Sequence, residues 1–491
     1  MKTPYYITTT LPYVNAEPHI GFALEIVQAD MLARIQRLRG DEVIFNTGTD
    51  EHGQKIYKKA LEAGIEPKAY CDGYAEKFHE LKELLNLTYT NFIRTTDDKH
   101  VAAAQEFWKR CDANGDIYKK QYQTKYCVGC ELEKTDSELV DDRCPIHPKM
   151  EIELRDEENY FFRWSKYQQP LLDYYAAHPD FVMPTAKFNE IKNFVAAGLN
   201  DFSISRLKDK MPWGIAVPGD EEHVMYVWFD ALVNYISTLD WFAVTSAQGG
   251  GDVSESFEKF WPGVQVAGID NLRQQSAMWQ AMLLSAGLPL SKQIFIHSFI
   301  TVDGQKMSKS LGNVIGPKDL VAMYGTDAVR YYLLREMPYG TDGDYSAGRM
   351  EERFAELAND LGNLMGRVAA MSIKYFDGEV DKVPFNHAEL DVRMGEALKH
   401  YDFKAYIDTV WTVVNAANLK IQTEEPFKLA KTDADAAKKS LSELAAMIVW
   451  IGYALSPVIP TAADEILRRY TGDKLIHGEP LFPRRDQELN T

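Results

Sequence analysis

The 491-residue sequence contains few cysteines and no long uninterrupted hydrophobic run. Its five cysteines are an odd number, which argues against the disulfide framework of a small secreted protein. The most apolar stretch, 441–459, is broken by Glu443, Gly452 and Pro457, so we expect no membrane-spanning helix. The N-terminus runs directly into a strand-like segment without the apolar core of a signal peptide. These absences together predict a cytoplasmic protein.

An excess of positive charge is also absent, because 54 Lys and Arg are outnumbered by 72 Asp and Glu, giving a net charge of −18. A protein that coats nucleic acid non-specifically is usually basic, so any polyanionic partner must bind to a local basic patch. Hydrophobic residues make up 45% and charged residues 26% of the chain, which is typical of a globular protein. The length predicts about three domains.

The order of apolar segments predicts an α/β fold with a Rossmann-type parallel sheet. A β-rich run at 5–10 is followed by a helix that begins near Pro18, ends before Gly40 and precedes a second strand at 42–46. The same alternation returns as a strand at 264–267, a helix from 271 to about 285 and a strand at 293–297. Such βαβ units form parallel sheets that bind ligands at the carboxyl ends of their strands.

The character of the sequence changes along the chain and predicts four segments. Residues 1–114 and 216–350 form the two halves of a Rossmann-type catalytic domain. Residues 115–215, which are rich in charge and hold a Cys/His cluster, form an insertion between these halves. Residues 351–491 show continuous helical periodicity, first in the stripe 354–368 and then at 388–421 and 436–470, and form a helical bundle.

Two short motifs are suited to binding a nucleotide. In Pro18-His19-Ile20-Gly21, a histidine and a glycine open a helix directly after a strand, where helix-tip amides favour phosphate. Gly21 also allows a planar base to approach the backbone. In Lys306-Met307-Ser308-Lys309-Ser310, two lysines three residues apart lie in a loop between glycines. Two such point charges suit a triphosphate whose charge shifts during reaction.

The cysteine cluster has the spacing of a zinc knuckle. Cys127 and Cys130 form one ligand pair, and Cys144 and His147 form a second pair further along the chain. Two such pairs supply the tetrahedral set of a structural Zn²⁺ site, which has no open position for catalysis. Cys71 and Cys111 lie outside this pattern and are interpreted as buried thiols without a chemical role.

These motifs resemble the two signature sequences of class I aminoacyl-tRNA synthetases, and nearly the whole chain resembles one family of that class, the methionyl-tRNA synthetases. The resemblance rests on segments in family order, which are Leu11-Pro12-Tyr13-Val14-Asn15, Thr47-Gly48-Thr49-Asp50-Glu51-His52-Gly53, the zinc knuckle, Tyr226-Val227-Trp228-Phe229-Asp230-Ala231 and the lysine loop. It implies a ligase that activates L-methionine with ATP and Mg²⁺ through methionyl-adenylate and transfers it to the terminal adenosine of a methionine tRNA.

The resemblance also implies residue roles. His19, Lys306 and Lys309 correspond to catalytic phosphate-contacting groups, and Asp270 corresponds to the carboxylate that binds the ATP ribose. The implied ATP site comprises His19, Gly21, Gly268, Asp270, Lys306, Ser308 and Lys309. The implied methionine site comprises Leu11, Tyr13, Asp50, Trp228, Ala231, Tyr235 and His297. Aromatic walls suit a thioether, which offers no strong hydrogen bond, although each aromatic residue alone could equally belong to the core.

The helical segment resembles the anticodon-binding domain of the family. Asn363 and Arg367 lie four residues apart, hence on one helix face, and match the pair that reads anticodon bases. Phe427 stands where the family has a stacking tryptophan and could instead be a packing residue. Phe22 and Ile269 depart from the family, which usually has a histidine and a lysine at these positions.

Three alternatives remain open at this point. A class I synthetase for another apolar amino acid would need a large editing insertion, whereas residues 115–215 are occupied by the zinc knuckle. A tRNA-binding protein without catalytic activity is suggested by Phe22 and Ile269. A small-molecule nucleotidyltransferase of related fold would have no use for the helical segment. We see no OB-like module after the bundle and therefore expect a monomer.

Overall fold

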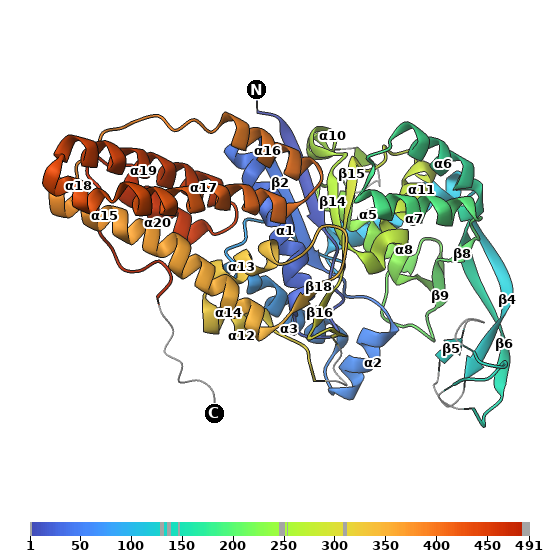
Figure 1. Ribbon diagram of the computed structural model, residues 1–491. Coiled ribbons are helices and arrows are strands. Elements are labelled where there is room, and N and C mark those ends of the chain that lie inside the picture. The colour runs from blue at the N-terminus through green and yellow to red at the C-terminus, as the bar shows by residue number, and fades with distance from the viewer. Residues whose placement is uncertain are drawn as a thin grey trace.

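The computed structural model describes residues 2–127, 132–134, 139–145, 148–244, 251–252, 254–307 and 312–483. Figure 1 shows a parallel-sheet region in the middle of the molecule, a long hairpin at one end and a helical bundle at the other. This arrangement confirms the predicted parallel sheet and the helical C-terminal region. No helix among the described residues is both long and apolar enough to cross a membrane.

The strands are β1 (Pro4–Thr9), β2 (Glu42–Thr49), β3 (Asn91–Arg94), β4 (Ile117–Cys127), β5 (Leu132–Lys134), β6 (Ile152–Phe162), β7 (Val182–Met183), β8 (Phe202–Ser203), β9 (Ser205–Leu207), β10 (Ala216–Val217), β11 (Asp220–Met225), β12 (Ala243–Val244), β13 (Gly251–Asp252), β14 (Val264–Gly268), β15 (Gln293–His297), β16 (Ile300–Val302), β17 (Gln305–Lys306) and β18 (Gly343–Tyr345).

The α-helices are α1 (Ile20–Leu38), α2 (Gln54–Glu62), α3 (Pro67–His79), α4 (Leu81–Leu84), α5 (Asp98–Ala113), α6 (Gln168–Ala177), α7 (Thr185–Ala196), α8 (Val227–Leu232), α9 (Asn234–Ser237), α10 (Glu255–Phe260), α11 (Trp279–Ser285), α12 (Pro317–Tyr324), α13 (Thr326–Arg335), α14 (Ala347–Ala355), α15 (Asn363–Phe376), α16 (Ala388–Lys399), α17 (Phe403–Glu424), α18 (Pro426–Thr432), α19 (Ala434–Leu455) and α20 (Pro460–Tyr470). Short 3₁₀ segments lie at Trp164–Tyr167 and Ile269–Asn271, and π-helical segments at Gln274–Met278 and Glu356–Gly362.

The central sheet has the strand order β3-β2-β1-β14-β15-β7, and all five pairings are parallel. β1 lies in the interior of the sheet, where Ile7 pairs with Phe45 on one side and Val264 on the other. Ile7 is completely buried because helices cover both faces of a parallel sheet. The carboxyl ends of β1, β2, β14 and β15 therefore lie together at one edge.

The segment 115–215 contributes to this sheet as well as to a separate one. β4 and β6 form a long antiparallel hairpin, flanked by β5 and β8, that projects from the molecule (Figure 1). β7 lies in the same segment, but it pairs with β15 and forms an edge of the central sheet. The segment is therefore joined to the catalytic sheet by backbone hydrogen bonds and is not merely tethered to it.

The structure differs from the predicted elements at several positions. The helix expected from Pro18 begins at Ile20, because His19 is its extended N-cap residue. The helix expected over 271–285 is broken into a 3₁₀ turn, a π-helical turn and α11. The π-helical turn reflects tertiary contacts, which the spacing of apolar residues does not reveal. Leu38, in the last turn of α1, is 62% exposed because this turn extends beyond the core.

Candidate active site

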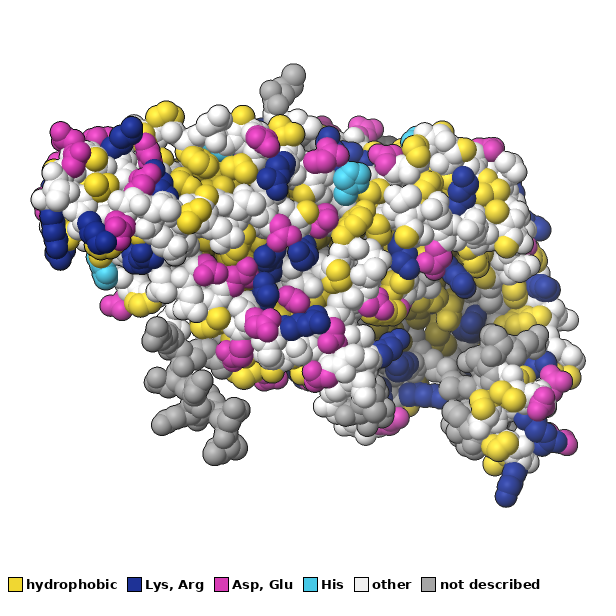
Figure 2. All heavy atoms as spheres, viewed as in Figure 1, with side chains coloured by type: hydrophobic (Ala, Val, Ile, Leu, Met, Phe, Trp, Pro, Cys, Tyr) yellow, Lys and Arg dark blue, Asp and Glu magenta, His cyan; other side chains and the backbone are white. Residues whose placement is uncertain are grey.

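One cavity of about 1540 Å³ lies at the carboxyl edge of the central sheet. It is lined by residues that directly follow β1, β2 and β14, by the last residue of β15, and by the start of α1. The face seen in Figure 2 is hollowed between α2 and the β4–β6 hairpin, and Lys and Arg side chains gather around this hollow. Among the described residues predicted from the sequence, the cavity is lined by Leu11, Tyr13, His19, Gly21, Asp50, Trp228, Ala231, Tyr235, Gly268, Asp270, His297 and Lys306.

His19 and Gly21 form the first turn of α1 at the cavity wall. The His19 side chain caps the helix, with its Nδ1 accepting a hydrogen bond of 3.1 Å from the Gly21 amide. Burial lowers the pKa of His19, so the neutral imidazole prevails at pH 7 and can donate through Nε2. A Cβ at position 21 would lie 2.9 Å from His19 Cε1, which explains the need for glycine.

The lysine loop lies against the same turn of α1. The Ile20 amide donates to the Ile315 carbonyl at 3.0 Å, and Met307 Cε lies 3.6 Å from where a Cβ of Gly21 would stand. Lys306 lines the cavity and packs its Nζ over the Phe299 ring, 4.7 Å from the centroid. The two motifs therefore meet at one cavity. Ser308 and Lys309 lie outside the described residues.

Asp50 follows β2 and presents a buried carboxylate to the cavity. Its backbone forms a bridge with Tyr13, and its Oδ1 has no hydrogen-bond partner among the described residues. Burial raises the pKa of Asp50 well above its usual value, and the nearby charge of Asp230 raises it further. An acceptor in this state is suited to a cationic ligand, which would supply both the missing hydrogen bond and the missing charge.

A buried polar network holds the helix beside Asp50. Asp230 on α8 accepts hydrogen bonds from His52 Nδ1 at 2.7 Å and His100 Nε2 at 2.8 Å. Burial opposes the ionisation of Asp230, but the two histidines outweigh it and lower the pKa of the carboxyl. Since α8 also carries Trp228 and Ala231, this network fixes the part of the cavity wall that α8 forms.

The predicted methionine pocket is a concave surface with few polar groups. The Tyr235 hydroxyl accepts from Gln275 Nε2 at 2.6 Å, and its ring packs edge-on against Trp279. The His297 Nε2 lies 3.0 Å from a carboxylate oxygen of Glu25. Tyr235 is 2% exposed and hence part of the core. It also lines the cavity, so its interpretation as a pocket residue and its interpretation as a core residue are compatible.

The predicted ribose side of the cavity lies after β14. Gly268 ends this strand and lines the cavity beside the His297 ring. Asp270 follows in the 3₁₀ turn and is exposed toward solvent. Ile269 between them packs against a hydrophobic cluster of the core, so it presents no charge to the cavity.

Phe22 lines the cavity one residue after Gly21. Its ring packs edge-to-face on Phe78, with ring centroids 5.3 Å apart, and contacts the core. This apolar contact explains why phenylalanine is accommodated at the position. The phosphate-binding side of the cavity consequently relies on His19 and the lysine loop.

Sequence reasoning missed several residues of the cavity. Glu25 accepts hydrogen bonds from the Thr10 amide at 2.7 Å and the Thr10 hydroxyl at 2.6 Å, and it is 4% exposed. The sequence could have indicated Glu25, because a glutamate on the apolar face of a helix is seldom buried without a partner. The other missed cavity residues that carry a charge or a side-chain amide are Glu17, Gln54, Lys55, Lys58, Glu157, Arg206, Lys210, Asn234, Asn271, Gln275 and Asp319.

The predicted anticodon residues lie far from this cavity in the helical bundle. Asn363 and Arg367 are exposed on α15, and Phe427 is 40% exposed at the start of α18. These two helices contact each other. The ring of Phe427 is exposed and therefore accessible for stacking. This exposure disfavours the alternative hypothesis that Phe427 is only a packing residue.

The predicted zinc knuckle is only partly described. Cys127 ends β4 and Cys144 follows a tight turn at 140–143, and both side chains are completely buried. Cys130 and His147 lie outside the described residues. Among the described residues no group of three or more potential metal ligands occurs.

Comparison with known proteins agrees with this geometry. The sequence model of the family described as tRNA synthetases class I (M) matches residues 5–152 and 129–369. The fold and the cavity thus define a class I aminoacyl-tRNA synthetase. The methionine–tRNA ligases of Thermosynechococcus vestitus and Thermotoga maritima are 44% and 40% identical, over 95% and 98% of this chain and 90% and 80% of theirs. The chain therefore belongs to the methionyl-tRNA synthetase family.

A solved structure extends the comparison to three dimensions. The Mycobacterium tuberculosis methionyl-tRNA synthetase in complex with methionyl-adenylate is 36% identical, with a TM-score of 0.85. The match covers 99% of this chain and 100% of that one. The apo form of the same enzyme matches with a TM-score of 0.80 over 99% of both chains.

Proposed function

We propose that this chain is a methionine–tRNA ligase that works in two steps. The methionine carboxylate attacks the α-phosphate of ATP, giving methionyl-adenylate and pyrophosphate. The 2′-hydroxyl of the terminal adenosine of the tRNA then attacks the mixed anhydride, and AMP leaves. The observation that carries this proposal is the single cavity lined by His19, Asp50, Asp270 and Lys306.

Catalysis of the first step rests on positioning and charge. The ATP ribose binds to Asp270, which can accept two hydroxyl hydrogen bonds, and the adenine approaches the backbone at Gly21 and Gly268. The phosphates meet His19 Nε2–H, Lys306 and the rest of the lysine loop, Ser308 and Lys309. These groups stabilise the charge that moves onto pyrophosphate, and Mg²⁺ bound to ATP neutralises part of it. No protein general base is required, because the attacking carboxylate is already ionised.

Recognition of methionine rests on one charge and several apolar walls. The α-ammonium pairs with Asp50 and the Leu11 carbonyl. The thioether lies against the side chains of Tyr13, Trp228, Ala231, Tyr235 and His297. The support for this assignment is that Asp50 lines the cavity and that its buried Oδ1 has no hydrogen-bond partner among the described residues, since the ammonium would supply the partner.

We further infer that Cys127, Cys130, Cys144 and His147 hold a structural Zn²⁺. The two described thiols, at Cys127 and Cys144, are completely buried, as expected of ligands to a closed site. When bound, the ion would crosslink the tip of the β4–β6 hairpin and would take no part in the reaction. The donor set of three thiolates and an imidazole is one that zinc prefers.

These assignments give each segment of the chain a function. Residues 1–114 and 216–350 form the catalytic domain, 115–215 the connective insertion with the zinc site, and 351–491 the anticodon-binding bundle. Asn363 and Arg367 read exposed base edges, while Phe427 stacks on a base. A cytoplasmic location and a monomeric state stay predictions from the sequence.

Exchange of labelled pyrophosphate into ATP tests the proposed function. Purified protein should support exchange with methionine and not with leucine, isoleucine or valine, because aromatic walls suit an unbranched thioether better than a branched aliphatic chain. Absence of exchange with any amino acid would favour a tRNA-binding protein without catalytic activity. Exchange with another apolar amino acid would overturn the assigned substrate.

A pair of arginine variants tests the role of the helical bundle. Arg367→Ala should lower kcat/KM for charging of full-length tRNA by about 10–100-fold, the usual effect of losing one base-reading contact. Arg393→Ala changes an exposed arginine on α16 and should leave charging unaltered. Both variants should keep normal pyrophosphate exchange. Unaltered charging in Arg367→Ala would contradict the anticodon-reading role, whereas exchange without any charging of tRNA by the wild-type protein would favour a small-molecule nucleotidyltransferase.

A further inference from the structure

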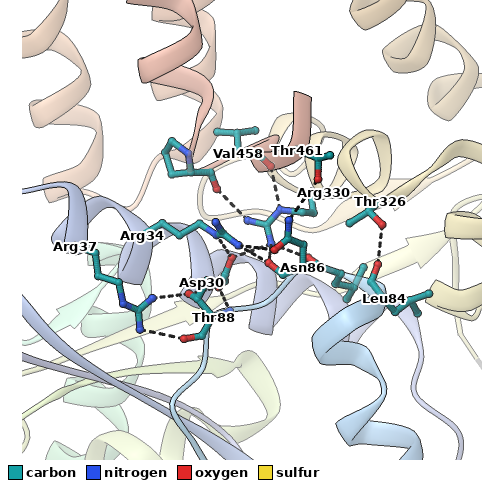
Figure 3. A network of polar contacts seen from close by, with 12 residues as sticks. Asp30, Arg34, Arg37, Leu84, Asn86, Thr88, Thr326, Arg330, Val458 and Thr461 are labelled. Carbon is teal, nitrogen blue, oxygen red and sulfur yellow. Dashed lines mark hydrogen bonds and ion pairs between the residues drawn. The ribbon is translucent and has the colours of Figure 1, made fainter. Parts of the chain in front are cut away.

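A completely buried arginine joins the catalytic domain to the helical bundle. Arg330 on α13 donates from Nε to the Val458 carbonyl at 3.0 Å and from one terminal nitrogen to the Pro457 carbonyl at 2.9 Å. Its other terminal nitrogen donates to the Leu85 carbonyl at 2.9 Å and pairs with Asp30 at 2.8 Å. Figure 3 shows these contacts converging on the guanidinium. We call these five residues the Arg330 clasp.

The Asp30 side of the clasp is tied to α1 and to the chain after α4. Asp30 is completely buried, and its Oδ1 accepts from the Thr88 amide at 2.6 Å and the Thr88 hydroxyl at 2.7 Å. Its Oδ2 accepts from Arg34 Nε at 2.7 Å, and Arg34 also donates to the carbonyl of Asn86 (Figure 3). Asp30 is therefore held by Thr88 and Arg34 as well as by Arg330.

The clasp connects the two functional regions of the molecule. Asp30 lies on α1, about 15 Å along the helix from its first turn, where His19 and Gly21 form the cavity wall. Pro457 and Val458 form the turn between α19 and α20 of the bundle that carries the anticodon residues. α13 lies between α1 and this bundle (Figure 1), and it contacts α1, α17 and α20. The clasp is thus a buried polar contact between α1, α13 and the helical bundle.

A second bond from α13 reinforces the same turn. Asp327 lies one helical turn before Arg330, and its Oδ2 accepts from the Ala462 amide in α20 at 2.6 Å. Apolar packing resists separation but is not directional. A planar guanidinium that engages carbonyls in fixed directions instead sets the angle at which two elements meet. This chemistry points to a role in orientation.

The domains have a further contact that does not involve the clasp. The Tyr401 hydroxyl donates to Gln293 Oε1 at 2.5 Å, and the Tyr401 ring stacks on Phe295 with centroids 4.6 Å apart. These residues join the α16–α17 turn to β15 and would keep the bundle docked if the clasp were weakened. Loss of the clasp would then alter the orientation of the bundle without releasing it.

We propose that Arg330 is a positioning residue for tRNA charging, which holds the bundle at the angle where anticodon contacts and entry of the tRNA 3′ end into the cavity occur together. The proposal rests on the proposed function. Adenylate formation needs only the cavity, so it is independent of the clasp. A short acceptor-stem minihelix lacks the anticodon, so its charging is also independent of the bundle's orientation.

Arg330→Lys tests this role, because lysine keeps the charge beside Asp30 and loses the planar fork. We expect kcat/KM for full-length tRNA to fall about tenfold or more, while methionine-dependent exchange and minihelix charging stay within about twofold of wild type. The same change at Arg349, an exposed arginine on α14, should alter none of the three activities. Equal loss of minihelix and full-length charging, loss of exchange, or unaltered charging of full-length tRNA would each overturn the proposal.

Combination with Arg367→Ala adds a readout that a purely structural role would not change. If orientation by the clasp is needed for the anticodon contact to promote charging, Arg367→Ala should lower charging far less in Arg330→Lys than in wild type. Independent, multiplicative effects of the two changes would contradict the proposal.

A second variant covers the case in which Arg330→Lys does not fold, as judged by its melting curve. Asp327→Ala removes the other bond by which α13 holds the same turn of the bundle, the one to the Ala462 amide. A loss confined to charging of full-length tRNA would support orientation of the bundle by α13, whereas unaltered charging or equal loss of all three activities would overturn it. Wild-type protein that lacks exchange would instead show that the proposed function, and not the clasp, is at fault.

Discussion

Replacement of Asp50 by asparagine should make the ligand-free protein more stable and the enzyme nearly inactive. The Asp50 carboxylate is buried, its Oδ1 has no partner among the described residues, and the charge of Asp230 lies nearby. Each of these features destabilises the ionised form in the absence of methionine. Asparagine has a similar shape and no charge, so it relieves the repulsion without creating a cavity.

The size of the effect follows from ordinary costs of burial. A buried polar group without a partner destabilises a protein by about 1–3 kcal/mol, so we expect the free energy of unfolding to rise by about 1–2 kcal/mol at pH 8. Because the pKa of Asp50 is raised in the folded state, the wild-type protein loses stability as pH rises above the ordinary value of 3.8. The difference in free energy of unfolding between Asp50→Asn and the wild type should therefore grow as pH increases from about 4 to 8.

The same change should weaken methionine binding strongly. Loss of one partner from a buried, charged hydrogen bond costs about 3–4 kcal/mol, or about 10²–10³-fold in the dissociation constant for methionine. Urea unfolding at several pH values and calorimetric titration with methionine measure the two effects separately.

Glu51 offers a matched control with the opposite expected sign. Its carboxylate is completely buried but fully paired, with Arg94 Nε at 2.6 Å and a second Arg94 nitrogen at 2.9 Å. Glu51→Gln should therefore destabilise the protein, because it weakens a satisfied buried pair. Destabilisation by Asp50→Asn of the same size, or undiminished methionine binding, would refute the reasoning for Asp50.

Three further predictions concern catalysis, pH and metal. Lys306→Ala should lower kcat of pyrophosphate exchange by about 10²–10³-fold with little change in KM for methionine, whereas Lys318→Ala, nearby on α12, should change neither; equal losses in kcat and KM would contradict the role. Asp230→Asn should cost about 3 kcal/mol of stability at pH 7 and remove the loss of stability that we expect in the wild type as pH falls below 3.8, since the pKa of Asp230 is lowered on folding; pH-dependent urea unfolding measures both. Elemental analysis should find one zinc per wild-type chain and a much lower content in Cys144→Ser, with Cys111→Ala at the wild-type level; equal zinc in both variants would refute the assigned ligands.

The positions of β1, β2, β14 and β15 in the central sheet could be predicted closely from the sequence because strand and loop chemistry are local. The strand expected at 293–297 is observed as β15 with the same bounds, and the one expected at 42–46 extends to Thr49. The ends of parallel strands meet at one edge, which agrees with the position of Asp50 and Asp270, whose roles the family resemblance implied, at one cavity. Elements made irregular by tertiary contacts, such as the π-helical turn at 274–278, leave no periodic signal.

The partners of the buried charged residues could not be predicted from the sequence. Glu25, Asp230 and Arg330 each lie within an apolar stretch and find partners far away in the chain. Nothing in a single sequence connects Arg330 to Asp30 or to the carbonyls of Pro457 and Val458. Such networks follow from the packing of whole domains, so they become visible only in three dimensions.

A crystal structure with a non-hydrolysable methionyl-adenylate analogue tests the central claim most directly. The claim is that α1 and the lysine loop, distant in the sequence, act on one nucleotide. We predict the adenosine between the first turn of α1 and Asp270, the phosphate mimic within hydrogen-bond reach of His19, and the thioether beside Trp228. An analogue bound with its adenosine away from both Gly21 and Asp270 would contradict the account.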